Sequence, residues 1–188
     1  MKKALKEILS TSIYLLIVLL CTYLFIQFVA QRTIVKGSSM EPTLVGTDED
    51  EPDKVGDNLI VDKLSYRFGE PERFDIIVFP YRMDSKQLLI KRIIGMPGET
   101  VEVREDGFIY INGEQLKEGY GKEIIDSNHL GTVEYPITLG KDEYFVLGDN
   151  RNNSSDSRYP MVGNVHREDI IGKAWLRIWP FSKIGTVH

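Results

Sequence analysis

The sequence predicts a mainly β protein, in which a single N-terminal transmembrane helix is followed by an antiparallel, barrel-like β domain. Two observations predict this fold. Residues 13–30 form a run of eighteen positions without a charged side chain. After Ala30, short stretches of alternating apolar and polar residues follow one another, and Gly or Pro interrupts them every eight to fifteen positions. That pattern is typical of a β-sandwich or barrel.

The apolar run 13–30, extended by 10–12, approaches the roughly 20 residues that a helix needs to cross about 30 Å of hydrocarbon. A removable signal peptide is the alternative, because lysines precede the run. The apolar region of a signal peptide would span only about 7 to 15 residues and would end at a cleavage site with small residues. Phe28 stands where a small residue would be needed, so we expect a retained anchor.

The lysines before the run set the expected orientation, because positive charge favours the cytoplasmic side. Lys2, Lys3 and Lys6 all precede the apolar run. We therefore expect residues 1–12 in the cytoplasm, 13–30 in the membrane and 31–188 as one extracytoplasmic domain.

Composition narrows the function of that domain. From Gln31 onward it holds 20 basic and 27 acidic side chains, which argues against nucleic acid as a partner. The single cysteine, Cys21, lies within the apolar run. The sequence therefore predicts no intramolecular disulfide and no cysteine-rich metal site.

The expected strands follow in order along the chain. They are RTIVKG (32–37), DNLIVDKL (57–64), FDIIVFP (74–80), QLLIKRIIG (87–95), TVEVRE (100–105), FIYINGEQL (108–116), EYFVLGD (143–149) and DIIGKAWLRIWP (169–180). Asn112 and Gly113 predict a type I′ hairpin, since both positions need positive φ. Two polar segments, 46–54 and 118–136, are expected to be connectors.

A serine nucleophile with a histidine base is poorly supported. His129, His166 and His188 lie in polar contexts or at the end of the sequence, and neither Gly-x-Ser-x-Gly nor His-Glu-x-x-His occurs. The sequence predicts neither a histidine triad nor a bound metal or other cofactor.

Lysine can act as the base only when it is neutral, which requires its pKa to fall by about 3 units from about 10.4. Burial lowers the pKa in this way. Lys91 lies in the apolar stretch LLIKRIIG, with Leu89 and Ile93 expected on its own face of a strand. For this stretch alone, an edge-strand lysine whose ammonium reaches water is the more common explanation of the pattern.

Three motifs occur in order after the apolar run: GSSMEPTL (37–44), LLIKRIIGMPGE (88–99) and GDNRNNSSDSR (148–158). Together they resemble the bacterial type I signal peptidases, membrane-bound Ser-Lys proteases that remove signal peptides from exported proteins. The resemblance covers the anchor and about 33–180. The sequence is similar to the short form of these enzymes, which is typical of Gram-positive-type bacteria and has neither a second membrane span nor a large inserted β domain.

The resemblance implies a role for each matching position. Ser39, directly before Met-x-Pro, corresponds to the nucleophile, and Lys91 corresponds to the general base. Ser154 resembles the serine that orients the lysine amine, Asp156 and Arg158 resemble the pair that holds its loop, and Arg92 with Asp149 form a second candidate pair.

The resemblance also implies the substrate. A preprotein with small residues, commonly Ala-x-Ala, before the cut would bind as a β-strand beside 34–36 and 75–79. Met40, Leu44, Val78 and Ile90 are candidate pocket residues by position, although core packing explains each of them equally well. The expected partners are signal peptides and the lipid bilayer.

Two positions depart from the family pattern. Gly37 stands where some members carry a serine that helps to bind the oxyanion, and Asn152 stands where the family often has aspartate. A self-cleaving Ser-Lys protease of the repressor type and a non-enzymatic, membrane-tethered binding domain are the alternative functions.

Overall fold

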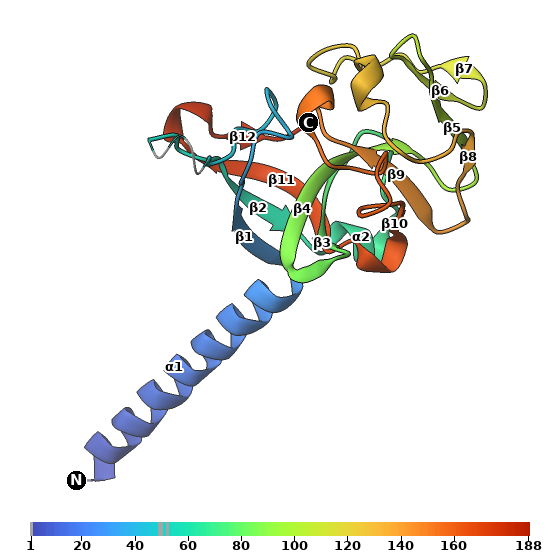
Figure 1. Ribbon diagram of the computed structural model, residues 1–188. Helices are drawn as coiled ribbons and strands as arrows, with labels where there is room; N and C mark the ends of the chain where they lie inside the picture. Colours follow the sequence, from blue (N-terminus) through green and yellow to red (C-terminus); the bar gives the residue numbers. More distant parts are fainter. Residues whose placement is uncertain (1, 49–50, 52) are drawn as a thin grey trace.

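The computed structural model describes residues 2–48, 51 and 53–188. One long helix, α1 (Lys2–Phe28), projects from a β domain (Figure 1). Only Val29 separates α1 from the first strand, β1 (Ala30–Ile34). The mainly β class with an N-terminal apolar helix is therefore confirmed. The helix begins earlier than 13–30 and ends two residues sooner, because Ala30 already pairs with Asp62 in the sheet.

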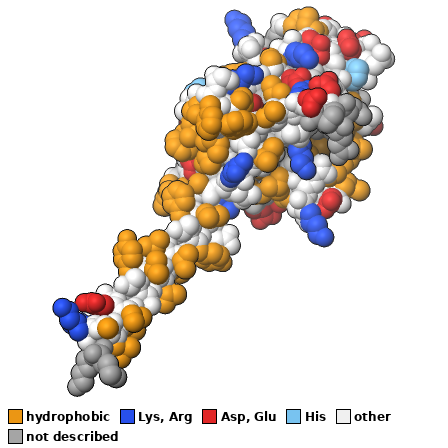
Figure 2. Space-filling model, turned by 90° about the vertical axis from the view of Figure 1, so that its left-hand side faces the viewer, with side chains coloured by type: hydrophobic (Ala, Val, Ile, Leu, Met, Phe, Trp, Pro, Cys, Tyr) orange, Lys and Arg blue, Asp and Glu red, His pale blue; other side chains and the backbone are white. Residues whose placement is uncertain are grey.

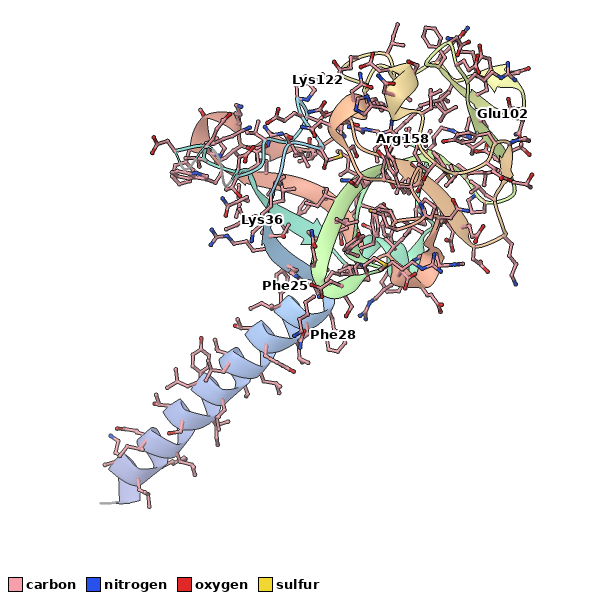
Figure 3. All side chains as sticks on the ribbon, in the orientation of Figure 1. Phe25, Phe28, Lys36, Glu102, Lys122 and Arg158 are labelled. Carbon is pink, nitrogen blue, oxygen red and sulfur yellow. The ribbon has the colours of Figure 1, made fainter. Side chains whose placement is uncertain are left out.

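The apolar surface of α1 is exposed. Its Lys3–Phe28 stretch has a mean hydropathy of 2.2 in its most apolar window, of which none is buried, so its length and composition suffice to cross a membrane. Figure 2 shows apolar side chains along the helix and charged ones at its far end. Phe25 and Phe28 lie at the end that joins the domain (Figure 3). There Lys63 donates from its backbone to the Val29 carbonyl and from Nζ to that of Gln27.

The larger sheet has eight strands, and its named strands pair antiparallel. Its order is β1, β2 (Asn58–Asp62), β11 (Gly172–Trp179), β3 (Ile76–Tyr81), β4 (Asp84–Gly95), β9 (Glu143–Leu147) and β10 (Val165–His166), with β12 (Gly185–Thr186) paired to β11. This order brings β4 and β9, which are far apart in sequence, side by side. The predicted motifs on and after these two strands therefore meet.

A smaller four-stranded sheet adjoins it in the order β7 (Glu114–Gln115), β6 (Ile109–Ile111), β5 (Thr100–Val103) and β8 (Ile137–Thr138). The predicted hairpin is confirmed, with φ of 52° at Asn112 and 83° at Gly113 between β6 and β7. The segment 118–136 forms no strand and contains one 3-10 turn, η1 (Ser127–His129). Of the other expected connector, residues 49, 50 and 52 lie outside the described residues.

Several short elements were not predicted. They are α2 (Ser65–Phe68), η2 (Arg151–Asn153), η3 (Arg167–Asp169), η4 (Phe181–Lys183) and the two-residue strands β8, β10 and β12. Two to four residues carry too little periodicity to be recognised in a sequence.

Strand β4 is central because it contributes to three buried apolar clusters. Ile93 packs with Ile77 and Phe79, Ile94 with Val101 and Phe145, and Ile90 lies against the cluster of Met40, Leu44 and Ile76. Lys91 pairs across the strands with Ile77, and directly opposed residues share a face. Lys91 therefore lies on the face of Leu89 and Ile93, as strand alternation predicted.

Candidate active site

Ser39 lies in the loop that joins β1 to β2. Gly37 has a φ of +73° and donates its N–H to the Thr47 carbonyl at 2.9 Å. A side chain at Gly46 would place its Cβ 1.9 Å from the Gly37 oxygen, so the two limbs of the loop approach this closely only with glycine at position 46. The two limbs of the loop are thus joined at its base, two residues before Ser39.

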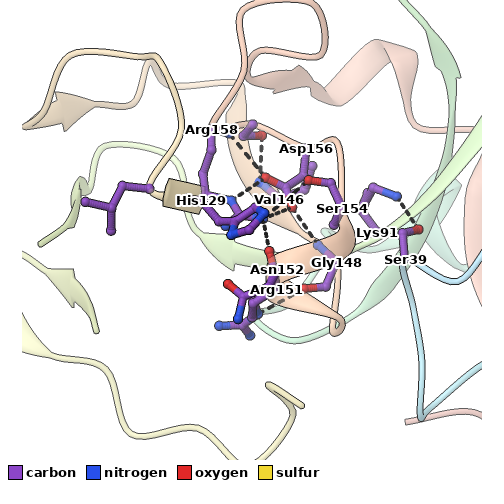
Figure 4. A network of polar contacts seen from close by, with 12 residues as sticks. Ser39, Lys91, His129, Val146, Gly148, Arg151, Asn152, Ser154, Asp156 and Arg158 are labelled. Carbon is purple, nitrogen blue, oxygen red and sulfur yellow. Dashed lines mark hydrogen bonds and ion pairs between the residues drawn. The ribbon is translucent and has the colours of Figure 1, made fainter. Parts of the chain in front are cut away.

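Lys91 reaches this loop from β4. Its Nζ lies 2.7 Å from Ser39 Oγ, and the residue is only 3% exposed. Burial lowers the pKa of Lys91 to about 8; the carboxylates of Asp156 and Asp149 oppose this shift, and the Arg158 guanidinium adds to it. The amine is therefore close to losing its proton near neutral pH while it touches a hydroxyl (Figure 4).

The loop 148–158 holds the backbone of Ser38 and Ser39 through hydrogen bonds. Asn150 donates its backbone N–H to the Ser39 carbonyl at 3.0 Å and its side-chain amide to the Ser38 carbonyl at 3.1 Å. Asn153 donates to Ser38 Oγ at 2.8 Å. These two asparagines were not among the predicted site residues, although both lie in the GDNRNNSSDSR motif. Turn chemistry alone accounts for asparagine in such a loop, so the motif did not reveal the contact.

Arg92 and Asp149 form a fully buried bidentate pair, with Nε to Oδ1 at 2.8 Å and Nη2 to Oδ2 at 2.7 Å. Thr43 also donates its hydroxyl to Asp149 Oδ2 at 2.6 Å. Asp149 therefore links β4 to the Ser39 loop. The sequence motifs gave no reason to single out Thr43.

Asp156 and Arg158 form a second buried bidentate pair, at 2.8 and 2.9 Å. Asp156 accepts the Gly148 N–H at 3.1 Å, and Arg158 donates to the carbonyls of His129 and Arg151 at 2.6 Å. This pair ties both limbs of the loop 148–158 to each other and to the connector 118–136. Both pairs of residues that the motifs suggested therefore form buried ion pairs in the structure.

Ser154 has a buried hydroxyl that makes no hydrogen bond within the described part of the chain. A Cβ added at Gly148 would lie 2.3 Å from Ser154 Oγ and 2.4 Å from the Ser39 carbonyl oxygen. Gly148 therefore lets Ser154 and the backbone of Ser39 approach the same point. Figure 4 draws Ser154 on the side of the network that faces Lys91.

The two departures from the family pattern have different surroundings. Asn152 accepts the Asp126 N–H at 2.9 Å and donates to the Ile124 carbonyl at 3.0 Å, and a carboxylate could not make the second bond. Gly37 offers no side chain to an oxyanion. In the described residues, the Ser39 N–H has no protein acceptor and is free to serve as a donor.

A pocket of about 280 Å³ opens beside Ser39 and Lys91. Its walls are residues 33–36, which continue from β1 into the following loop, and residues 86–91 within β4. Met40, which is itself only 1% exposed, and Ile90 line it, whereas the buried Leu44 and Val78 do not. The groove expected beside 75–79 is thus bounded by β4 instead, because β3 is covered by β4 and β11 on its two edges.

Within the described residues, no histidine imidazole bonds Ser39 or Lys91, although the backbone carbonyls of His129 and His188 accept hydrogen bonds from Arg158 and Arg92. The imidazole of His166 lies 3.8 Å from Glu143, and that of His188 bonds Thr186. Among the described residues, no group of three or more His, Cys, Asp or Glu side chains could hold a metal ion.

A buried serine–lysine contact on a β domain defines a candidate serine hydrolase, and comparison with known proteins gives the family. The model of the family "Signal peptidase, peptidase S26" matches residues 6–179. The chain therefore belongs to this family, and it is a serine protease of the signal peptidase I type.

Its curated relatives agree. A probable signal peptidase I-2 of Synechocystis sp. is 42% identical over 85% of this chain and 68% of its own length. The signal peptidase I of Bacillus caldolyticus is 38% identical over 83% of both. A crystal structure of a signal peptidase I from Enterococcus faecalis V583 is 39% identical and matches 56% of this chain and 97% of that one, with a TM-score of 0.46.

Proposed function

We propose that this protein removes signal peptides from exported preproteins by acyl transfer, with Ser39 as nucleophile and Lys91 as general base. The observation that carries the proposal is the 2.7 Å contact between Lys91 Nζ and Ser39 Oγ, made by a lysine that is only 3% exposed. A neutral amine at this distance can accept the hydroxyl proton directly.

The steps follow from that contact. Neutral Lys91 takes the proton of Ser39 as Oγ attacks the scissile carbonyl, and the resulting ammonium then protonates the departing amine. The acyl group remains on Ser39 Oγ. Lys91 next takes a proton from water, which attacks the ester, and returns that proton to Ser39. The Ser39 N–H donates to the oxyanion in both halves of the reaction.

The surrounding residues position this pair. Ser154, whose hydroxyl is buried without a partner among the described residues, would accept a hydrogen from the Lys91 amine and so direct the lone pair of that amine at Ser39. The buried pairs Arg92–Asp149 and Asp156–Arg158 hold the loop that fixes Ser154 and the Ser39 backbone.

The substrate would bind as an extended strand in the pocket between residues 33–36 and 86–91. Met40 and Ile90 narrow the pocket next to Ser39, which favours small side chains such as those of an Ala-x-Ala sequence. Leu44 and Val78 would act behind this surface, as packing for it.

Helix α1 would anchor the enzyme. We propose that it spans the bilayer once, with the N-terminal lysines in the cytoplasm and the domain from residue 31 outside. The chain from Ala30 to Ser39 can span at most about 30 Å, so the nucleophile stays close to the membrane surface where a signal peptide ends.

The test is cleavage of a preprotein with an Ala-x-Ala site by the full chain in detergent micelles. Ser39→Ala and Lys91→Met should each lower the rate by at least about 10³-fold. Ser182→Ala is the matched control, because it removes the hydroxyl of an exposed serine in η4, away from Ser39 and its loop, and it should cut at a rate close to that of the unsubstituted enzyme.

Three outcomes would contradict the proposal. Normal cleavage by Ser39→Ala would show that Ser39 is not the nucleophile. Shortening of the purified chain itself, without attack on the preprotein, would favour a self-cleaving protease. Peptide binding that Ser39→Ala leaves unchanged, with no hydrolysis by any form, would favour a binding domain.

A further inference from the structure

The segment Glu118–Lys122, which we call the strap, contacts the loop 148–158 at Asp149 and Arg151. It follows β7 and belongs to the connector 118–136; Lys122 marks its end in Figure 3. Its sequence, EGYGK, has no apolar pattern. Three of its alternating residues nevertheless contact residues that hold Ser39 and its loop.

The first contact is an ion pair. Glu118 accepts hydrogen bonds from both terminal nitrogens of Arg151, one of them at 2.7 Å, and the two side chains are 13% and 3% exposed. Arg151 also donates Nε to the Gly148 carbonyl at 2.9 Å. A Cβ at Gly121 would lie 3.3 Å from the Arg151 guanidinium carbon, so glycine lets the strap lie directly against this side chain.

The second contact is an aromatic cover. The ring of Tyr120 lies 3.8 Å from the guanidinium carbon of Arg92 and 5.1 Å from the ring of Phe74. Arg92 donates to Asp149 and to the Phe74 carbonyl. A ring over a desolvated guanidinium attracts the cation and keeps water from its hydrogen bonds.

The third contact is a backbone bond. Lys122 donates its N–H to the Asp149 carbonyl at 2.8 Å. The next residue, Asn150, donates its own N–H to the Ser39 carbonyl at 3.0 Å. One peptide unit, that between Asp149 and Asn150, is therefore held by the strap on one side and holds the Ser39 backbone on the other.

We propose that the strap is a positioning element for catalysis. In it, Tyr120 holds the Arg92–Asp149 pair in place and thereby keeps Asn150 hydrogen-bonded to the Ser39 carbonyl. This inference rests on the proposed role of Ser39. Tyr120 does not touch Ser39 or Lys91 in the contacts described, so it acts through Arg92 and Asp149.

Kinetics of preprotein cleavage test the proposal. Tyr120→Ala should lower kcat by about tenfold to a hundredfold, because small displacements of reacting groups are this costly. KM should change by less than about twofold, since the strap is remote from the substrate pocket. Tyr120→Phe keeps the ring over Arg92 and should restore kcat. Lys117→Ala, at an exposed residue directly before the strap, is the matched control.

A second measurement does not depend on activity. Hydrogen exchange of the Asn150 amide, followed in the full chain in micelles, should be faster in Tyr120→Ala than in Tyr120→Phe or Lys117→Ala. If Tyr120→Ala does not fold, Tyr120→Leu replaces it in both experiments.

The outcomes separate the two proposals. If the Asn150 amide exchanges at the same rate in Tyr120→Ala and Tyr120→Phe, the proposed role of the strap is wrong. The same conclusion follows if these two variants have the same kcat. Undiminished cleavage by Ser39→Ala would instead overturn the proposed nucleophile, while faster exchange of Asn150 in Tyr120→Ala would still show that the strap holds this peptide unit.

Discussion

Replacing Lys91 with Met should stabilise the folded protein at neutral pH even though it abolishes cleavage. Burial lowers the pKa of Lys91 from 10.5 to about 8, and this shift costs about 3 kcal/mol of folding free energy at pH 7, where the amine is mostly charged. Met removes that cost and fills a similar volume, but it loses the hydrogen bond to Ser39, worth about 1 kcal/mol. The expected net gain at pH 7 is about 2 kcal/mol.

The pH dependence gives the sharper test. Because the folded-state pKa lies below the unfolded one, the folded state releases its proton first, and the unsubstituted protein gains stability as pH rises from about 8 to 10.5. The advantage of Lys91→Met should therefore shrink by about 2 to 3 kcal/mol between pH 7 and pH 10. Other titrating groups are shared by the two proteins and cancel in the difference.

The assay is chemical denaturation of both proteins in detergent micelles at several pH values. Lys86→Met is the matched control, because Lys86 lies on the same strand and is exposed, and its stability difference should not vary with pH. If Lys91→Met is less stable than the unsubstituted protein by the same amount at pH 7 and pH 10, then folding does not lower the pKa of Lys91, and the reasoning fails.

Two further predictions follow from the site. The cleavage rate should rise about fivefold from pH 7 to pH 8 and less than about twofold from pH 8 to pH 9, because the neutral fraction of Lys91 grows through a pKa of about 8; a rate profile that falls over this range would contradict a lysine base. Gly148→Ala should lower activity by at least about tenfold and lower the midpoint of thermal unfolding, since its Cβ would lie 2.3 Å from Ser154 Oγ. Gly185→Ala, with no atom within 4 Å of its Cβ, should leave both unchanged, and an active Gly148→Ala enzyme would mean that this close approach is not needed.

The sequence predicted the fold where periodicity was long. The alternation in QLLIKRIIG marked β4 and placed Lys91 on an apolar face, and Asn112-Gly113 marked the hairpin. Both depend on local chemistry, which a sequence displays directly.

The tertiary parts of the site were visible only through the family motifs or not at all. Ser39 and Lys91 are separated by 52 positions in sequence, and no local pattern indicates their contact. Thr43 and Asn150 act through hydrogen bonds that turn residues make in many loops without function. Val78 follows strand alternation like Ile90, but its strand lies between β4 and β11, which the sequence alone did not reveal.

The single residue between α1 and β1 makes a short mechanical joint. Val29 leaves almost no room for a hinge, and Lys63, directly after β2, donates hydrogen bonds to the carbonyls of Gln27 and Val29. Any rotation of the helix about its long axis is therefore transmitted to the sheet. If α1 spans the bilayer as proposed, the opening of the pocket keeps a fixed orientation around the helix axis, and a preprotein diffusing in the membrane would have to approach the enzyme from that side.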